Sequence, residues 1–420
     1  MIAPWVAPVA QAPVRARVRL PGSKSLTNRA LVLASMARSS STLVAPLHSR
    51  DTALMATGLR ALGTGIVEAG PDWVVQPAPL RGPADIDVGN AGTVMRFLPP
   101  VAALASGEVR FDGDVRARHR PLAPIVQALS DLGVDVEATD GRLPLTVRGR
   151  GWVLGGSAVI DASLSSQFVS ALLLAAPRFA DALEIRHEGG RLPSGTHIDM
   201  TVTLLRQAGV IVEHVNHHAW RVEPGPLHLG RFLVEPDLSN AAPFLAAAMV
   251  TGGEVTVPGW PLQTTQAGDS LRGVLGAFGG QAELHDGGLT VTGPDRLSGV
   301  DLDLGDVGEL TPVVAAVAAL AVSPSRLRGI AHLRHHETDR LAALRTEIRG
   351  LGGDVIETED GLQIRPRPLS GGRFETYDDH RLAMAGAVLG LCVPGIVLSD
   401  VATTAKTLPG FVDLWTEMLG

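Results

Sequence analysis

The chain has few aromatic residues, a single cysteine and an excess of negative charge. Aromatic side chains make up 4% of its 420 residues, which leaves little material for base stacking and favours cores of Ala, Leu and Val. The formal net charge of −7 argues against a general nucleic-acid surface, because such surfaces are positive. A small anionic ligand is still compatible with it, since a few clustered Arg and Lys side chains set a local potential.

The scarcity of cysteine and the interrupted apolar runs argue against disulfide-linked, cysteine-rich zinc and membrane-spanning proteins. Cys392 alone cannot form an internal disulfide or a cysteine-rich zinc site, and in the apolar stretch GAVLGLCVPG we expect it to be buried. No run of 18 apolar residues is free of Gly, Pro or charge, so no membrane span is predicted. The opening MIAPWVAPVAQAPV has no basic segment, so we expect no secretory signal and a cytoplasmic location.

A unit of roughly 70 residues recurs along the chain. Each copy has an extended segment, a polar turn and an Ala/Leu-rich helix, followed by a second helix that ends on glycine, as in LRALG at 59–63 and LRQAG at 205–209. Glycine is the expected C-cap there. We therefore predict an α/β fold of six strand–helix–strand–helix–strand–strand units, the first beginning near residue 18, divided into two similar domains near Arg231–Pro236.

Polar and charged residues gather where the helices of these units begin. A helix N-terminus presents free N–H groups and a positive dipole end, which favour anions. If like units point their helices the same way, these termini converge on an anionic substrate between the domains. The residues are Lys24, Ser25, Arg29, Asn90, Gly92, Thr93, Arg96, Arg120, Ser165, Ser166, Gln167, Ser194, Asp237, Ser239, Asn240, Glu309, Glu337, Asp378, Asp379, His380 and Arg381.

Two motifs in this set have rival interpretations. PGSKSLTNR lacks the glycine spacing of a nucleotide P-loop, and a helix capped by Ser23 explains neither Lys24 nor Arg29. HETDR would be a zinc helix only with histidine at its fifth position, where Arg340 stands. Acid–base chemistry with arginines that bind carboxylate or phosphate fits better than a metal site.

Seven motifs in order resemble one family. They are PGSKSLTNR, GNAGT, RP at 120–121, SSQF, HETDRL, DDHR and KTLPGF. The chain resembles the 5-enolpyruvylshikimate-3-phosphate synthases over nearly its whole length, in a form like that of actinobacteria. The resemblance implies transfer of the enolpyruvyl group of phosphoenolpyruvate to the 5-hydroxyl of shikimate 3-phosphate, the sixth step of the shikimate pathway to chorismate and the aromatic amino acids.

The resemblance also implies an architecture. The expected fold has two inverse α/β-barrel-like domains of three repeated units each, which close on the substrates. Residues 21–236 would form the domain that binds shikimate 3-phosphate. Residues 1–20 plus 237–420 would form a discontinuous domain with the phosphoenolpyruvate clamp and the catalytic carboxylates. No metal or organic cofactor is implied, glyphosate is the implied inhibitor, and we expect a monomer.

Site residues are carried over position by position. For shikimate 3-phosphate the implied ligands are Lys24, Ser25, Arg29, Ser165, Ser166, Gln167, Ser194, Glu309 and His336. For phosphoenolpyruvate they are Lys24, Gly92, Arg120, Gln167, Arg340, Arg381 and Lys406. Glu309 is the implied proton acceptor, with Glu337 and Lys24 handling the methylene proton. Three histidines depart from the common pattern: His336 replaces a lysine, His197 a tyrosine and His332 an asparagine.

Two alternatives are weaker. The UDP-N-acetylglucosamine enolpyruvyl transferases share the fold, but they typically use a cysteine in a mobile loop of the N-terminal half, whereas Cys392 comes late in the chain. A binding protein of the same fold without activity would have no reason to keep the two carboxylates together with the clamp.

Overall fold

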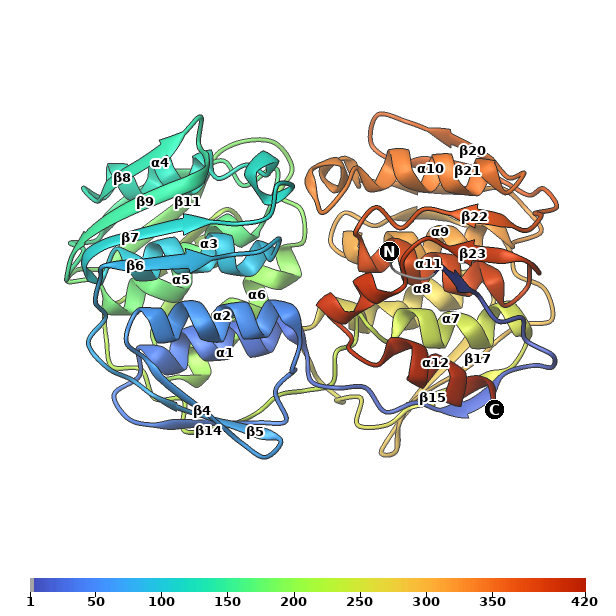
Figure 1. Cartoon of the computed structure of the whole chain (residues 1–420), viewed down its shortest axis with the longest axis horizontal. Coiled ribbons are helices and arrows are strands. Elements are labelled where there is room, and N and C mark those ends of the chain that lie inside the picture. The colour runs from blue at the N-terminus through green and yellow to red at the C-terminus, as the bar shows by residue number, and fades with distance from the viewer. Residues whose placement is uncertain (1–3) are drawn as a thin grey trace. The chain divides into compact units, whose positions relative to one another are not determined.

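The computed structural model describes residues 4–420, which form two compact units. The N-terminal unit is Gly22–Val234. The C-terminal unit is discontinuous, combining the residues up to Pro21 with Glu235–Gly420. Both contain helices packed against sheets (Figure 1). Among the described residues, each helix is too short or too polar to cross a membrane.

The N-terminal unit contains three four-stranded sheets of one design. In each, the first two strands in spatial order are parallel and the remaining pairs are antiparallel. The sheets, in spatial order, are β14 (Arg231–Leu233), β3 (Ser41–Val44), β5 (Asp72–Gln76), β4 (Gly65–Ala69); β6 (Ala84–Asp87), β7 (Ser106–Asp112), β9 (Arg142–Arg150), β8 (Asp135–Thr139); and β10 (Gly156–Ile160), β11 (Leu183–His187), β13 (Ala219–Val222), β12 (Val212–Asn216).

Six α-helices accompany these sheets. They are α1 (Lys24–Ser35), α2 (Arg50–Ala61), α3 (Gly92–Ala102), α4 (Ala123–Asp131), α5 (Gln167–Ala175) and α6 (Gly195–Gln207), with short 3-10 turns at Ala117–His119 and Ala176–Arg178. Every residue of α3 is buried, and α3 packs on both α1 and α5. Since these helices pack on one another at buried positions, the first helices of the three units form the core of this unit.

The C-terminal unit repeats the design. Its sheets, in spatial order, are β2 (Arg15–Arg17), β15 (Glu254–Val257), β17 (Gly288–Thr292), β16 (Gln281–His285); β18 (Asp301–Asp303), β19 (Ser325–Arg328), β21 (Leu362–Arg365), β20 (Asp354–Glu357); and β1 (Trp5–Val6), β23 (Ile396–Leu398), β22 (Gly372–Phe374). Its helices are α7 (Ala242–Thr251), α8 (Leu271–Ala277), α9 (Thr311–Ala319), α10 (Arg340–Gly350), α11 (His380–Gly390) and α12 (Phe411–Leu419), with 3-10 turns η3 (Ala267–Ser270), η4 (Gly308–Leu310), η5 (Ala331–His335) and η6 (Ala402–Lys406).

The helix ends follow the predicted glycine rule. Gly63, Gly133, Gly209, Gly279 and Gly352 follow the second helices of successive units, and all five have φ between 78° and 105°. Glycine adopts this left-handed conformation without the penalty that a Cβ brings. The expectation that these glycines terminate the helices is confirmed.

The repeat pattern misassigned the strands at its two ends, although the family resemblance places residues 1–20 with the C-terminal domain. The segment before α1 does not start the first sheet: β2 pairs in parallel with β15 of the C-terminal unit, and β14 takes its place beside β3. The sixth sheet is also no full copy, since its third strand is β1, which pairs antiparallel with β23 (Figure 1). Strand patterns reveal that a segment pairs but not with which segment, so the exchange was invisible in the repeat.

Cys392 corrects a smaller expectation. It follows α11 and is exposed, because the apolar helix ends before it. Its sulfur donates a hydrogen bond to the Val250 carbonyl at 3.2 Å. Desolvation by the surrounding protein raises the pKa of the Cys392 thiol to about 11.

Candidate active site

The start of α1 carries the first of the predicted ligands of the N-terminal unit. Ser23 accepts a hydrogen bond from the Leu26 N–H at 3.4 Å, so the predicted N-cap is confirmed. Lys24 Nζ lies 3.5 Å from Oδ2 of Asp51, a buried residue in the first turn of α2. This pairing holds the ammonium group at the helix N-terminus, which already favours an anion.

Arg29, one turn further along α1, is buried. It donates to Thr201 Oγ1 at 2.7 Å, to the Ser25 carbonyl at 3.1 Å, to the His197 carbonyl at 3.1 Å and to Ser170 Oγ at 3.4 Å. Burial lowers the pKa of Arg29 to about 9, so it is still a cation at neutral pH. In this state the guanidinium braces α1 against α5 and α6.

The N-terminus of α3 is built around Gly92. A Cβ there would lie 2.8 Å from Arg120 Nη2 and 3.1 Å from Arg96 Nη1. Arg120 is held by the carbonyl and side-chain oxygens of Asn90 at 3.0 and 3.1 Å, and Arg96 donates to Gln167 Oε1 at 2.8 Å. Two guanidinium groups thus meet bare backbone, an arrangement that suits a carboxylate or phosphate.

The loop before α5 and the start of α6 carry the predicted serines. Ser165 Oγ accepts from the Gln167 N–H at 3.3 Å, Ser166 is buried, and Ser194 precedes α6 with φ of 52°. These hydroxyls lie on two different loops of the same unit, so something must hold the loops in register.

His187 joins these two loops. Its Nδ1 accepts from the Ala162 N–H at 3.1 Å, and its Nε2 lies 2.9 Å from the Gly190 carbonyl. Nδ1 also lies 3.2 Å from the Ile160 carbonyl, but the shorter contact of Nε2 with Gly190 and the N–H donated by Ala162 favour the hydrogen on Nε2. Nothing in the sequence singled out this residue, because a lone histidine at a strand end has no diagnostic spacing.

In the C-terminal unit, Arg340 is a buried cation held by two carboxylates. It donates to Asp379 through Nε at 2.7 Å and Nη2 at 3.1 Å, and Nη2 also lies 3.1 Å from Glu337 Oε2. Burial acts to lower the pKa of Arg340, but the charges of Asp379 and Glu337 outweigh it and hold that pKa above its ordinary value. The side chain is 3% exposed, so this charge is fixed in place.

Glu337 and Lys406 form a second buried contact, with Nζ 2.7 Å from Oε1. Glu309, in η4, accepts from Ser239 Oγ at 3.2 Å. Arg381 donates to the Ser239 carbonyl at 2.8 Å, and burial lowers its pKa against the attraction of Asp237 and Glu309. The structure therefore brings two carboxylates and the three clamp cations into one linked network.

Comparison with known proteins decides the family. The family described as EPSP synthase (3-phosphoshikimate 1-carboxyvinyltransferase) matches residues 9–415. The chain belongs to this family. It is 56% identical over 430 residues to the 3-phosphoshikimate 1-carboxyvinyltransferase of Kocuria rhizophila, a match that covers 99% of this chain and 96% of that protein. The predicted family is confirmed.

Two solved structures titled EPSP synthase, both from Acinetobacter baumannii, share the fold. Their TM-scores are 0.80 and 0.79, each is 23% identical, and each match covers 98% of this chain and 97% of the other. The predicted fold class is confirmed as that of the EPSP synthases.

Asp379 is a residue of this EPSP synthase site that the sequence analysis did not select as a ligand or catalyst. It is fully buried, binds Arg340 with both oxygens, and caps α11 by accepting from the Arg381 N–H at 2.9 Å. One carboxylate therefore binds the Arg340 guanidinium and fixes the start of the helix that carries Arg381. The signal lay in the DDHR motif, where an aspartate precedes a helix that starts with His-Arg.

The three unusual histidines have distinct settings. His336 Nδ1 lies 3.2 Å from Arg340 Nη1, and its ring meets that of His332 edge to face at 5.6 Å between centroids. A Cβ at Gly308 would lie 2.6 Å from His332 Nε2, so this glycine lets His332 approach the turn that carries Glu309. His197 contributes its carbonyl to Arg29. Within residues 4–420, no cluster of three His, Cys, Asp or Glu side chains could hold a metal ion.

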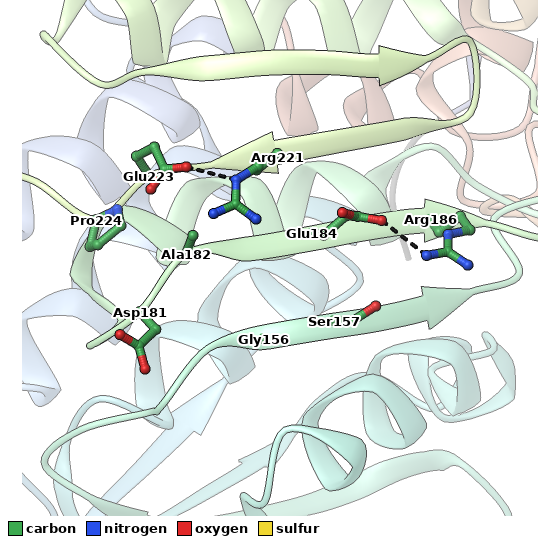
Figure 2. Close-up of a pocket in the computed structure, with 9 residues that line it drawn as sticks. All are labelled: Gly156, Ser157, Asp181, Ala182, Glu184, Arg186, Arg221, Glu223 and Pro224. Atoms are coloured by element: carbon green, nitrogen blue, oxygen red, sulfur yellow. Dashed lines mark hydrogen bonds and ion pairs between the residues drawn. The ribbon is translucent and has the colours of Figure 1, made fainter.

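A surface pocket elsewhere in the N-terminal unit is separate from these groups. It lies on β10, β11 and β13 and contains none of the predicted ligands (Figure 2). Its two arginines are paired with neighbouring carboxylates, Arg221 with Glu223 at 2.7 Å and Arg186 with Glu184 at 3.0 Å (Figure 2). Because each cation already has an anion at an exposed position, this pocket offers little to a phosphorylated substrate.

Proposed function

We propose that this chain transfers the enolpyruvyl group of phosphoenolpyruvate to the 5-hydroxyl of shikimate 3-phosphate and releases phosphate. One observation carries the proposal within the family: the Glu337 carboxylate lies between the Lys406 ammonium and the Arg340 guanidinium. This is an acid–base group inside a cationic site, as a reaction between two anionic substrates requires.

The cations have a clear task. Both substrates carry a phosphate and a carboxylate, so bringing them together costs charge repulsion. We assign phosphoenolpyruvate to Lys24, Gly92, Arg120, Gln167, Arg340, Arg381 and Lys406. We assign shikimate 3-phosphate to Lys24, Ser25, Arg29, Ser165, Ser166, Gln167, Ser194, Glu309 and His336. The bonds of Arg29 to Thr201, Ser25, Ser170 and His197 leave one guanidinium hydrogen for shikimate 3-phosphate.

The proposed chemistry is addition followed by elimination. Glu309 takes the proton of the 5-hydroxyl while the oxygen attacks the central carbon of phosphoenolpyruvate and the methylene carbon gains a proton, giving a tetrahedral phosphorylated intermediate. In the second half the new methyl group loses a proton, the double bond reforms and phosphate leaves. Glu337, flanked by two cations, suits the proton acceptor of the second half, and Lys24 suits the donor of the first.

These steps need only proton transfer and charge stabilisation, so we assign no metal or organic cofactor to them. We also expect glyphosate to compete with phosphoenolpyruvate, and we expect a monomer in the cytoplasm. Sedimentation velocity on the purified full chain tests the oligomeric state directly.

Phosphate release from purified protein supplied with shikimate 3-phosphate and phosphoenolpyruvate tests the proposal. Release that depends on both substrates supports it. Release only when UDP-N-acetylglucosamine replaces shikimate 3-phosphate would establish the rival transferase instead. Binding of both substrates without release would indicate a binding protein of the same fold.

A further inference from the structure

The loop from β22 to α11 holds an unfavourable backbone conformation. Tyr377 and Asp378, neither of them glycine, both have φ of 53°. A side chain in the left-handed region costs free energy, and consecutive residues of this kind persist only where the surroundings impose them. The loop must therefore be held by specific contacts.

Glu347 supplies two of those contacts. Its Oε1 accepts from the Tyr377 hydroxyl at 2.5 Å, and its Oε2 accepts from the Glu375 N–H at 2.8 Å. Glu347 is 6% exposed, and a buried carboxylate with two well-placed donors is a strong anchor. The Ser399 hydroxyl secures the residue between them by accepting from the Thr376 N–H at 3.0 Å.

The same loop carries Asp379. The Asp379 N–H donates to the Thr376 carbonyl at 2.8 Å, which closes the turn formed by the two left-handed residues. Asp379 then binds Arg340 with both oxygens and caps the helix that starts with His380 and Arg381. The path of the loop thus determines where this carboxylate meets the Arg340 guanidinium and the Arg381 N–H at the start of α11.

Helix α10 contacts the loop near both of its ends. Its first residue, Arg340, binds Asp379, and Glu347, two turns later, binds Tyr377 and Glu375. If the Glu347 contacts were lost, Tyr377 and Asp378 could relax to ordinary φ values. Asp379 would then shift relative to Arg340.

We propose that Glu347 and Tyr377 form a latch that positions Arg340 and Arg381 for phosphoenolpyruvate. The role of the two arginines rests on the proposed function. Neither latch residue is assigned a contact with substrate, so both are positioning residues. Glu347 is separated from Arg340 by two turns of α10, and Tyr377 is separated from Arg381 by the turn with left-handed φ values.

The first test is Tyr377→Phe, which removes one hydroxyl and keeps the ring. We expect the KM for phosphoenolpyruvate to rise about tenfold while the KM for shikimate 3-phosphate stays within twofold, because only the clamp is misplaced. Trp260→Phe is the matched control: it removes an aromatic hydrogen bond to a carboxylate, Trp260 Nε1 to Asp269 Oδ1 at 2.8 Å, in the same unit. It should lower stability without changing the ratio of the two KM values.

The double variant Tyr377→Phe/Glu347→Gln separates a latch from two independent residues. In a latch the two substitutions break one interaction, so the double variant should raise the KM for phosphoenolpyruvate no more than the worse single variant. Effects that multiply would overturn the proposal, as would equal KM ratios in Tyr377→Phe and Trp260→Phe.

A second test needs no activity. Tyr377 is the only tyrosine in the chain, so its ionisation can be followed by ultraviolet absorbance while circular dichroism reports folding. Burial and the Glu347 hydrogen bond raise the pKa of Tyr377, and Glu347→Gln should bring it down towards about 10, the value of a free tyrosine. Ionisation near that value in the folded wild-type protein would overturn the latch whatever the activity. If the titration supports the latch while shikimate 3-phosphate and phosphoenolpyruvate release no phosphate, the proposed function fails instead.

Discussion

Lys406 Nζ lies 2.7 Å from Glu337 Oε1, and Glu337 Oε2 lies 3.1 Å from Arg340 Nη2. A single carboxylate therefore partly neutralises two cations that would otherwise repel each other at buried positions. An arriving anionic substrate can take over that neutralisation, which frees Glu337 for proton transfer. In the proposed mechanism, this arrangement would link the binding of anionic substrate to the availability of Glu337 for proton transfer.

Glu337→Gln tests that link. The amide keeps the shape but cannot take a proton, so turnover should fall by about 10²–10⁴, the usual contribution of a general acid–base group. Single-turnover phosphate release measures it without interference from product dissociation. Turnover within threefold of wild type would remove Glu337 from the mechanism.

Glu309→Gln should lower turnover by a similar factor of about 10²–10⁴ while substrate binding is largely kept. Ser239→Ala is the matched control, because it removes the hydrogen bond to Glu309 Oε1 and leaves the carboxylate. We expect a loss several-fold smaller from the control. Near-normal turnover in Glu309→Gln would show that another group accepts the hydroxyl proton.

Gly92→Ala should weaken glyphosate more than phosphoenolpyruvate. The added methyl group must displace Arg120 or Arg96, since its position lies 2.8 and 3.1 Å from their nitrogens. Glyphosate is longer than phosphoenolpyruvate, so it has less room to shift away from the added methyl group. Inhibition and saturation curves measured on the same preparation provide the comparison, and equal changes in Ki and KM would contradict the prediction.

Asp379→Ala should lower the free energy of unfolding by about 3–5 kcal/mol, because it strips a buried guanidinium of its bidentate partner. Asp339→Ala gives the scale for a helix cap, since Asp339 accepts from the Ala342 N–H at the start of α10 and, within residues 4–420, has only one exposed ion pair, with Arg334 at 3.7 Å. It should cost about 1 kcal/mol. Urea denaturation distinguishes the two. Equal losses would mean that Asp379 acts only as a cap.

Cys392 should be slow to react and dispensable. Its pKa of about 11 keeps the thiol protonated at neutral pH, so labelling of the folded protein should accelerate until the pH nears 11, whereas the unfolded chain should level off near 9. Cys392→Ser should retain full phosphate release. Loss of activity on alkylation would revive a cysteine-dependent mechanism.

The features that could be predicted are those that depend on short, contiguous stretches of sequence. The motif order identified the family, and glycines such as Gly63 and Gly352 marked helix ends because a left-handed cap needs no partner elsewhere. The candidate ligands around Gly92 and Arg340 were selected at helix starts for the same local reason. Their roles toward substrate stay predictions.

The features that escaped prediction depend on long-range pairing. Asp379 meets Arg340 across 39 positions, and Tyr377 meets Glu347 across 30. The left-handed φ at Tyr377 has no residue signature, since glycine would be expected there. The family resemblance placed residues 1–20 in the C-terminal domain, but the pairing of β2 with β15 itself depends on tertiary structure, because many short strands share the same alternating pattern.

The discontinuous C-terminal unit has a consequence for biosynthesis. The partner of β2, the strand β15, leaves the ribosome about 240 residues later, which at 5–20 residues per second is a delay of roughly 10–50 s. The Gly22–Val234 unit is contiguous, so it can fold during that interval, while the leading strands are still unpaired. Chaperones that cover exposed strand edges would then be needed most over β1 and β2.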